Sequence, residues 1–161
     1  MQRLLTLLGF VLVLAAPASA QVDIGFGGVS YDARTPIEVT ADSLSVDQAT
    51  GEAVFAGNVI VVQGDLRMSA GNVRVVYAGE GGAQDVREVI ATGGVLVTRG
   101  SDAAEGGQAR FNVASSLLTL SGNVLVTQGS TAIAGDSMVV NMRTGSGSVD
   151  GRVRTVLGGG D

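Results

Sequence analysis

The sequence predicts an all-β fold of about sixteen short strands, and three observations lead to this prediction. A run of β-branched and aliphatic residues bounded by glycine, GNVIVVQG at 57–64, returns as GNVLVTQG at 122–129 and more loosely as GGVLVTRG at 93–100. Apolar and polar residues alternate along much of the chain, as in half-buried strands. No stretch after residue 20 holds a helical period, and turn residues recur about every 8 to 12 positions, which is typical of a sandwich, barrel or solenoid.

A second, fainter repeat is interleaved with the first. It starts at residues 41, 70, 106 and 135 with ADSLSVD, AGNVRVV, GGQARFN and GDSMVVN, so a unit of about 29 residues recurs. The middle unit is seven residues longer, and the Gly-rich segment 78–84 is predicted to hold the extra residues in a longer turn. Each copy of the 57–64 run is predicted to be a buried strand between two tight turns.

The first twenty residues have the pattern of a cleaved signal peptide. Arg3 precedes an apolar run at 4–16, and Ala18-Ser19-Ala20 is an A-x-A cleavage signal. A retained membrane anchor is the alternative, but a run of about 13 residues is shorter than the ~20 needed to span a bilayer. The mature chain is therefore expected to begin at Gln21, with 21–34 as a flexible arm.

A single domain is expected over residues 35–157, followed by a flexible tail at 158–161. A break is expected at 145–147, where glycines cluster. The alternation predicts strands, in chain order, at 37–40, 44–47, 53–55, 58–63, 66–69, 73–77, 86–91, 94–99, 108–114, 117–120, 123–128, 132–134, 138–142 and 152–157.

The alternation keeps a constant phase from unit to unit. If Val59 and Val61 face inward, the matching valines of the other copies face inward too. Arg74 and Arg110 occupy one repeat position on the opposite face, so they are expected to lie near each other on the outside. Asp42 and Asp136 are expected to accept N–H groups of turns.

Composition excludes several functional classes. The chain has no Cys, which removes disulfides and thiolate chemistry, and no His, which removes the usual general base. All 10 basic residues are Arg, and the net charge of −5 argues against binding nucleic acid. The glycines of 145–151 lack the third Gly of a G-x-G-x-x-G loop. No enzyme activity, cofactor or metal is predicted.

The repeated G-N-V-x-V-x-Q-G runs, the ADSL slot at 41–44 and the signal peptide together resemble the OstA-like family of lipopolysaccharide transport proteins. The resemblance covers about residues 36–156. It implies an open, twisted β-jelly-roll of about sixteen antiparallel strands, whose apolar interior holds the acyl chains of lipid A. It also implies a periplasmic bridge that pairs with like folds on inner-membrane and outer-membrane components, and head to tail with copies of itself.

The inward positions that match the family's strands form the expected lipid-binding set. They are Ile37, Val39, Leu44, Val46, Val59, Val61, Val95, Val97, Phe111, Leu118, Leu120, Val124, Val126, Met138 and Val140. Two alternatives stay open at this point. One is the membrane-tethered component of the same transport system, which would keep its N-terminal helix. The other is a structural β-solenoid of the cell surface, whose core would be solid and free of lipid.

Overall fold

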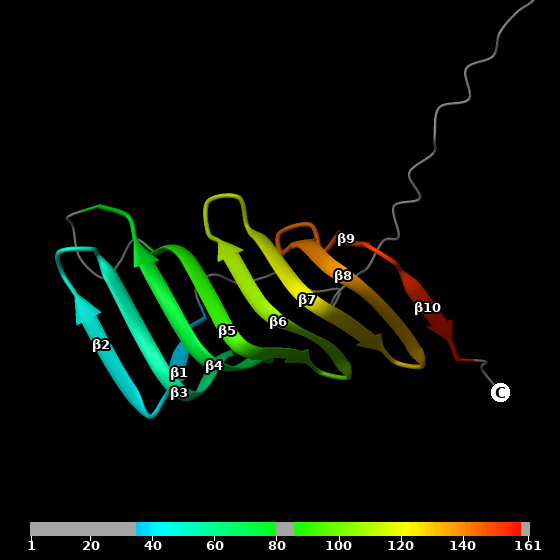
Figure 1. Ribbon diagram of the computed structural model, residues 1–161, viewed down its shortest axis with the longest axis horizontal. Coiled ribbons are helices and arrows are strands. Elements are labelled where there is room, and N and C mark those ends of the chain that lie inside the picture. Colours follow the sequence, from blue (N-terminus) through cyan, green and yellow to red (C-terminus); the bar gives the residue numbers. More distant parts are fainter. Residues whose placement is uncertain (1–34, 80–85, 159–161) are drawn as a thin grey trace, which may run out of the picture.

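The computed structural model describes residues 35–79 and 86–158, and these form one antiparallel sheet of 10 strands (Figure 1). The strands are β1 (Glu38–Thr40), β2 (Ser43–Asp47), β3 (Glu52–Gln63), β4 (Leu66–Tyr77), β5 (Val86–Arg99), β6 (Asp102–Asn112), β7 (Leu117–Gln128), β8 (Thr131–Asn141), β9 (Gly147–Asp150) and β10 (Arg154–Leu157). These ranges contain no helix, so the all-β prediction is confirmed. The expected signal peptide, the N-terminal arm, most of the Gly-rich segment and most of the tail lie outside the described residues.

The sheet is a meander in which the long strands follow one another in chain order (Figure 1). β1 and β2 both pair with β3, and together they form one edge of the sheet. β9 and β10 both pair with β8 and form the other edge. The break expected at 145–147 is shorter than predicted, because β9 already begins at Gly147.

The sheet has fewer strands than the predicted sixteen, because β3 to β8 are each 11 to 14 residues long. The glycine that begins each repeated run does not end a strand. Gly57 (φ 81°) and Asn58 (φ 48°) instead form a bulge inside β3, where the pairing with β4 shifts between Ala56 and Val59. A bulge bends a strand while the ladder continues on both sides of it.

The prediction of a tight turn at the first glycine of each run is therefore wrong, whereas a turn does follow each run. Gly64, Gly100 and Gly129 each lie in a two-residue connection with φ of 61°, 56° and 54°. Such short hairpin loops require a positive φ, which glycine adopts without strain.

The bulges are aligned across the sheet and divide it into two halves. We call the line of bulges the corner row. Half A comprises 43–47, 52–56, 72–77, 86–92, 108–112, 117–121, 137–141 and 147–150. Half B comprises 38–40, 59–63, 66–70, 95–99, 102–106, 124–128, 131–135 and 154–157. Buried residues of both halves belong to a single apolar cluster, so the sheet bends at the corner row around one core.

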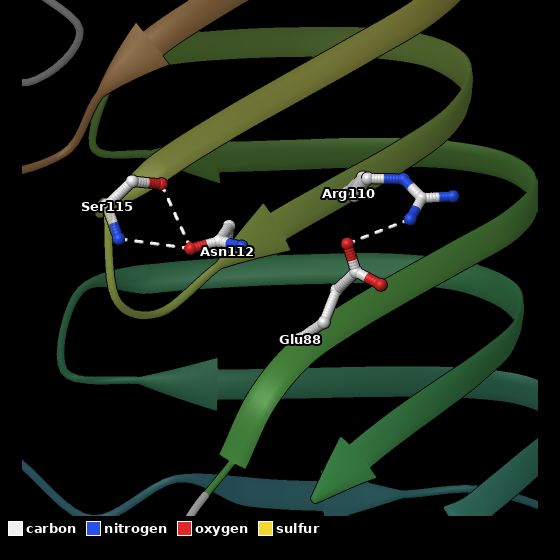
Figure 2. A network of polar contacts seen from close by, with 4 residues as sticks. All are labelled: Glu88, Arg110, Asn112 and Ser115. Carbon is white, nitrogen blue, oxygen red and sulfur yellow. Dashed lines mark hydrogen bonds and ion pairs between the residues drawn. The ribbon is translucent and has the colours of Figure 1, made fainter. Parts of the chain in front are cut away.

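The outward face of half A carries ion pairs that cross neighbouring strands. Arg74 pairs with Glu52 at 3.8 Å, and Arg110 pairs with Glu88 at 2.8 Å (Figure 2). The two arginines do not touch each other as neighbours. They lie on either side of Ile90, which is opposite Arg74 on β4 and opposite Arg110 on β6. Ile90 is buried although it faces outward, which fits long arginine stems covering an apolar neighbour.

Candidate lipid-binding face

Side chains directly opposite each other lie on the same face of a sheet, so the inward face consists of rows that run across the strands. The rows on both sides of the corner row are aliphatic, whereas the row at the half-B turns contains Gln63, Leu66, Arg99 and Asp102. In half B, one row contains Val39, Val61, Met68, Val97, Ala104, Val126 and Ile133. In half A, one row contains Leu44, Phe55, Val73, Ala91, Ala109, Leu120, Met138 and Val149. The two rows lie on opposite sides of the corner row.

The centre of this face is tightly packed. Leu120 in half A and Val126 in half B are both 0% exposed. Eight of the fifteen residues in the predicted lipid-binding set are buried here, namely Val59, Val95, Val97, Leu120, Val124, Val126, Met138 and Val140. Val39, Val61 and Leu118 are partly buried and pack against the same cluster. Phe111 is half-buried beside Leu118 on the next strand.

The remaining three predicted residues lie at the β1–β2 edge and are exposed. Ile37 and Val46 are each 60% exposed, and Leu44 is 56% exposed. Leu44 is opposite Phe55 and so continues the inward row of half A, but no strand in the described part of the chain covers its other side. The aliphatic row is therefore sealed in the middle of the sheet and accessible at this edge.

Several inward residues were absent from the predicted set. Met68, Val73, Ala91, Ala104, Ala109 and Ile133 belong to the same cluster. Met68 could have been found from the two-residue turn after Gln63, because that turn pairs Gln63 with Leu66 and hence Val61 with Met68. The alanines carry no comparable signal, since a small residue is as common outside a sheet as inside it.

Within 35–79 and 86–158 no polar or charged side chain is buried, and no buried side-chain polar atom lacks a hydrogen-bond partner. A ligand on the aliphatic rows of the inward face would therefore be held by apolar contact, whose strength follows the area removed from water. The described residues hold no group of acidic, His or Cys side chains that could bind a metal ion. No helix among them is long and apolar enough to cross a membrane.

Two aspartates, Asp42 and Asp136, lie at the corner row. The Asp42 carboxylate accepts a hydrogen bond of 2.8 Å from the Asn58 side-chain amide, and the Asp136 carboxylate accepts one of 3.1 Å from Arg152. Their partners are thus side chains, not the turn N–H groups that were expected. The backbone N–H of Asp42 donates to the carbonyl oxygen of Gly57 at 3.0 Å, and the backbone N–H of Asp136 donates to the carbonyl oxygen of Gly151 at 3.2 Å.

Comparison with known proteins gives matches of three kinds. The family model described as "LptA/(LptD N-terminal domain) LPS transport protein" matches residues 38–146. An uncharacterised protein of Rhizobium meliloti (strain 1021) is 28% identical over 118 residues, which are 70% of this chain and 63% of that protein. The crystal structure of LptH from Pseudomonas aeruginosa, the LptA-homologous periplasmic component of its lipopolysaccharide transport device, is 20% identical with a TM-score of 0.68. That match covers 78% of this chain and 96% of LptH, and it shows a shared fold.

Proposed function

Since the chain belongs to the LptA/LptD N-terminal-domain family of lipopolysaccharide transport proteins, we propose that it is a periplasmic lipopolysaccharide-binding bridge. In this proposal the inward face shields the acyl chains of lipid A from water. Copies of the protein and like-folded membrane components assemble end to end, so that lipid passes from the inner to the outer membrane. The chain is exported with its first twenty residues as signal peptide, which is removed after Ala20.

The observation that carries this proposal is the aliphatic lining of the inward face on both sides of the corner row. Every strand from β1 to β8 contributes apolar inward side chains, and no buried polar side chain interrupts them within the described residues. Burying a CH₂ group stabilises by about 0.8 kcal/mol, so one twelve-carbon acyl chain is worth on the order of 9 kcal/mol. A lining of this kind supplies that energy without a specific polar contact.

Acyl chains must compete with the contacts that fill the centre of the core. Leu120 and Val126 are fully covered by their neighbours, so lipid can reach them only if halves A and B separate. We place lipid entry at the β1–β2 edge, where Leu44 and Val46 expose the end of the aliphatic row. The interior then opens progressively from that edge as side-chain contacts are exchanged for contacts with acyl chains.

Photo-crosslinking in a Gram-negative host tests the lipid assignment. A photoreactive residue at Val124 or Phe111, on the inward side, should capture lipopolysaccharide, while one at Arg110 should not. Arg110 is a matched control because it is next to Phe111 in the chain and its side chain points to the opposite face. Equal capture at all three sites, or no capture at the inward pair in folded protein, would overturn the proposal.

Two further measurements test the location and the assembly. N-terminal sequencing of protein from the periplasmic fraction should find Gln21 first, and Met1 on membrane-bound material would contradict export by cleavage.

Light scattering should show a size that grows with concentration, because a head-to-tail contact does not close on itself. Deleting 152–161 should weaken this association and leave the β-sheet circular dichroism largely intact.

A further inference from the structure

The corner row follows a regular alternation from one edge of the sheet to the other. Strands β3, β5 and β7 and the connection between β9 and β10 each contribute two consecutive residues with positive φ. These are Gly57-Asn58, Gly93-Gly94, Gly122-Asn123 and Gly151-Arg152. The residues that face these pairs from the strand before or after them are Asp42, Gly71, Gly107 and Asp136. Glycine fills the facing positions inside the sheet. Asp42 lies in the β1–β2 edge itself, and Asp136 lies on β8, next to the β9–β10 edge.

The two ends of this row carry opposite charges. At the β1–β2 edge the terminal member is Asp42, whose carboxylate is bound by the neutral amide of Asn58 at 2.8 Å. At the β9–β10 edge the terminal member is Gly151-Arg152, where the Arg152 side chain is 87% exposed and pairs with Asp136 at 3.1 Å. Glu38 and Asp47 also lie on the first edge, and Asp150 and Arg154 lie on the second.

Strand direction at the two edges allows the sheet to continue from one molecule to the next. The chain runs from half B to half A along β1 and β2, and from half A to half B along β9 and β10. A second copy can be placed with its β1–β2 edge beside β9 and β10, so that half A lies next to half A and half B next to half B. Its β1 and β2 are then antiparallel to β9 and β10, and the alternation of strand directions continues. The other sides of these four strands have no strand partner within the described ranges.

We propose that Arg152 of one copy pairs with Asp42 of a second copy, so that the corner row continues across the contact and fixes its register. This inference rests on the proposed end-to-end assembly and specifies how the copies meet. The register of the neighbouring strands then places Asp150 opposite Ser43 of the second copy and Thr155 opposite Val39 of the second copy. Arg152 lies between two aspartates, as Gly93-Gly94 lies between two glycines inside the sheet.

The same charges select head-to-tail pairing against the two alternatives. Two β1–β2 edges brought together would align Asp42 with Asp42, and two β9–β10 edges would align Arg152 with Arg152. Like charges directly opposite each other on paired strands are destabilising. In the proposed register, Glu38 of the second copy is also diagonal to Arg154 on the outward face, a distance that long side chains can span. The partner that fits this edge is therefore another copy in the same orientation.

Two charge-reversed chains provide the test. Asp42→Arg alone would bring two guanidinium groups together at the contact, and Arg152→Glu alone would bring two carboxylates together. Each variant should therefore associate about tenfold more weakly than the unmodified protein. An equimolar mixture should recover the unmodified affinity, because the two chains can alternate with opposite charges at every contact. Sedimentation velocity across a concentration series measures all three samples. Arg110→Glu reverses a charge in the middle of the sheet and should associate normally.

A variant that failed to fold could not regain its affinity when mixed with the other variant, so recovery on mixing reports on the contact itself. Circular dichroism of each variant checks its fold separately. If the unmodified protein associates and the two variants associate equally well, or if mixing restores nothing, the Arg152–Asp42 pair is wrong while end-to-end assembly stands. If the unmodified protein stays monomeric throughout, both the pair and the assembly are wrong. A monomeric unmodified protein is also the result expected if another segment of the same chain covers the β1–β2 edge.

Cysteine crosslinking tests the register directly, because the natural chain contains no cysteine. A chain with Ser43→Cys and Asp150→Cys should form a ladder of covalent multimers on mild oxidation. A control chain with Ser45→Cys and Asp150→Cys is two residues out of register and should remain monomeric on the same denaturing gel. A ladder from the control alone would overturn the proposed register.

Discussion

Asn58 and Asp42 are joined across the corner row by a hydrogen bond of 2.8 Å from the Asn58 side-chain amide to the Asp42 carboxylate. Asn123 occupies the equivalent position on β7, with a similar positive φ of 53° against 48° for Asn58. Its facing residue is Gly107, which has no side chain to accept a bond. The two asparagines thus share a backbone conformation and differ in their partner.

Replacing each asparagine with glycine separates these two effects. Asn123→Gly changes only the backbone preference at a position with positive φ. Asn58→Gly makes the same change and also removes the bond to Asp42, so it should lower the free energy of unfolding by about 0.5–1.5 kcal/mol more than Asn123→Gly. Urea denaturation of both variants measures the difference. Equal effects would show that the bond adds nothing to stability.

Gly57 has no room for a side chain, because a Cβ there would lie 2.9 Å from the Asp42 Cγ. Gly94 has a similar φ, 78° against 81°, but open space where its Cβ would be. Gly94→Ala should therefore cost only the strain of a positive φ, about 1–2 kcal/mol, and Gly57→Ala should cost more. In the Asp42→Gly background the two alanine variants should become similar in thermal denaturation. A penalty at Gly57 that persists without Asp42 would place the clash elsewhere.

Leu120 and Leu96 differ in burial, at 0% and 40% exposed. Leu120→Ala should lower the free energy of unfolding by about 2–5 kcal/mol, because it leaves a cavity in the shared core of the two halves. Leu96→Ala should change it by about 0.5 kcal/mol or less, as is usual for exposed positions. Chemical denaturation compares the two. Similar costs would mean that the two halves are not packed together in solution.

The Asp65 carboxylate, in the turn after β3, accepts a hydrogen bond of 3.0 Å from Arg99 Nε. This bond, with the charge of Arg99, lowers the pKa of Asp65 below its ordinary value. Because the folded pKa is the lower one, the stabilising contribution is present above the unfolded pKa and is lost as pH falls through the folded pKa. The contribution is small, since the Asp65 side chain is 62% exposed.

An NMR titration of the Asp65 carboxyl carbon measures this pKa directly. In Arg99→Gln the pKa of Asp65 should rise toward the ordinary aspartate value. In Arg67→Gln, which removes a positive charge two residues along the chain from Asp65 and leaves the Arg99 bond in place, it should stay close to that of the unmodified protein. An unchanged pKa in Arg99→Gln would contradict the assigned cause.

Local alternation in the sequence was sufficient to predict the all-β fold and most of the inward face. Val124 and Val126, or Met138 and Val140, alternate with their neighbours in the way that a sheet with one buried face requires. The bulges could not be predicted in the same way. A glycine such as Gly57 is equally compatible with a hairpin turn and with a bulge, since both use a positive φ. Only the pairing partners on both sides of Gly57 distinguish the two.

The exposed positions of the predicted set show a second limit of pattern-based reasoning. Leu44 and Val46 alternate as regularly as the buried residues do, yet they lie on an edge strand. Burial depends on what covers a strand, and the sequence of that strand contains no such information. Arg74 and Arg110 were expected to lie near each other because they occupy equal places in the repeat. In an antiparallel meander such places are two strands apart, so Ile90 lies between the two arginines.

The pairing of each long strand with its sequence neighbours also has a consequence for how the chain folds. From β3 to β8 every ladder joins consecutive strands, so no partner has to be found across a long stretch of disordered polypeptide. Sheets with such local connectivity fold faster than those that require distant pairings, because less loop entropy is lost before contacts form. As residues emerge in order from the ribosome or a translocation pore, each new strand finds its template already in place at the growing edge. Folding can therefore advance one hairpin at a time from the first strands to the last.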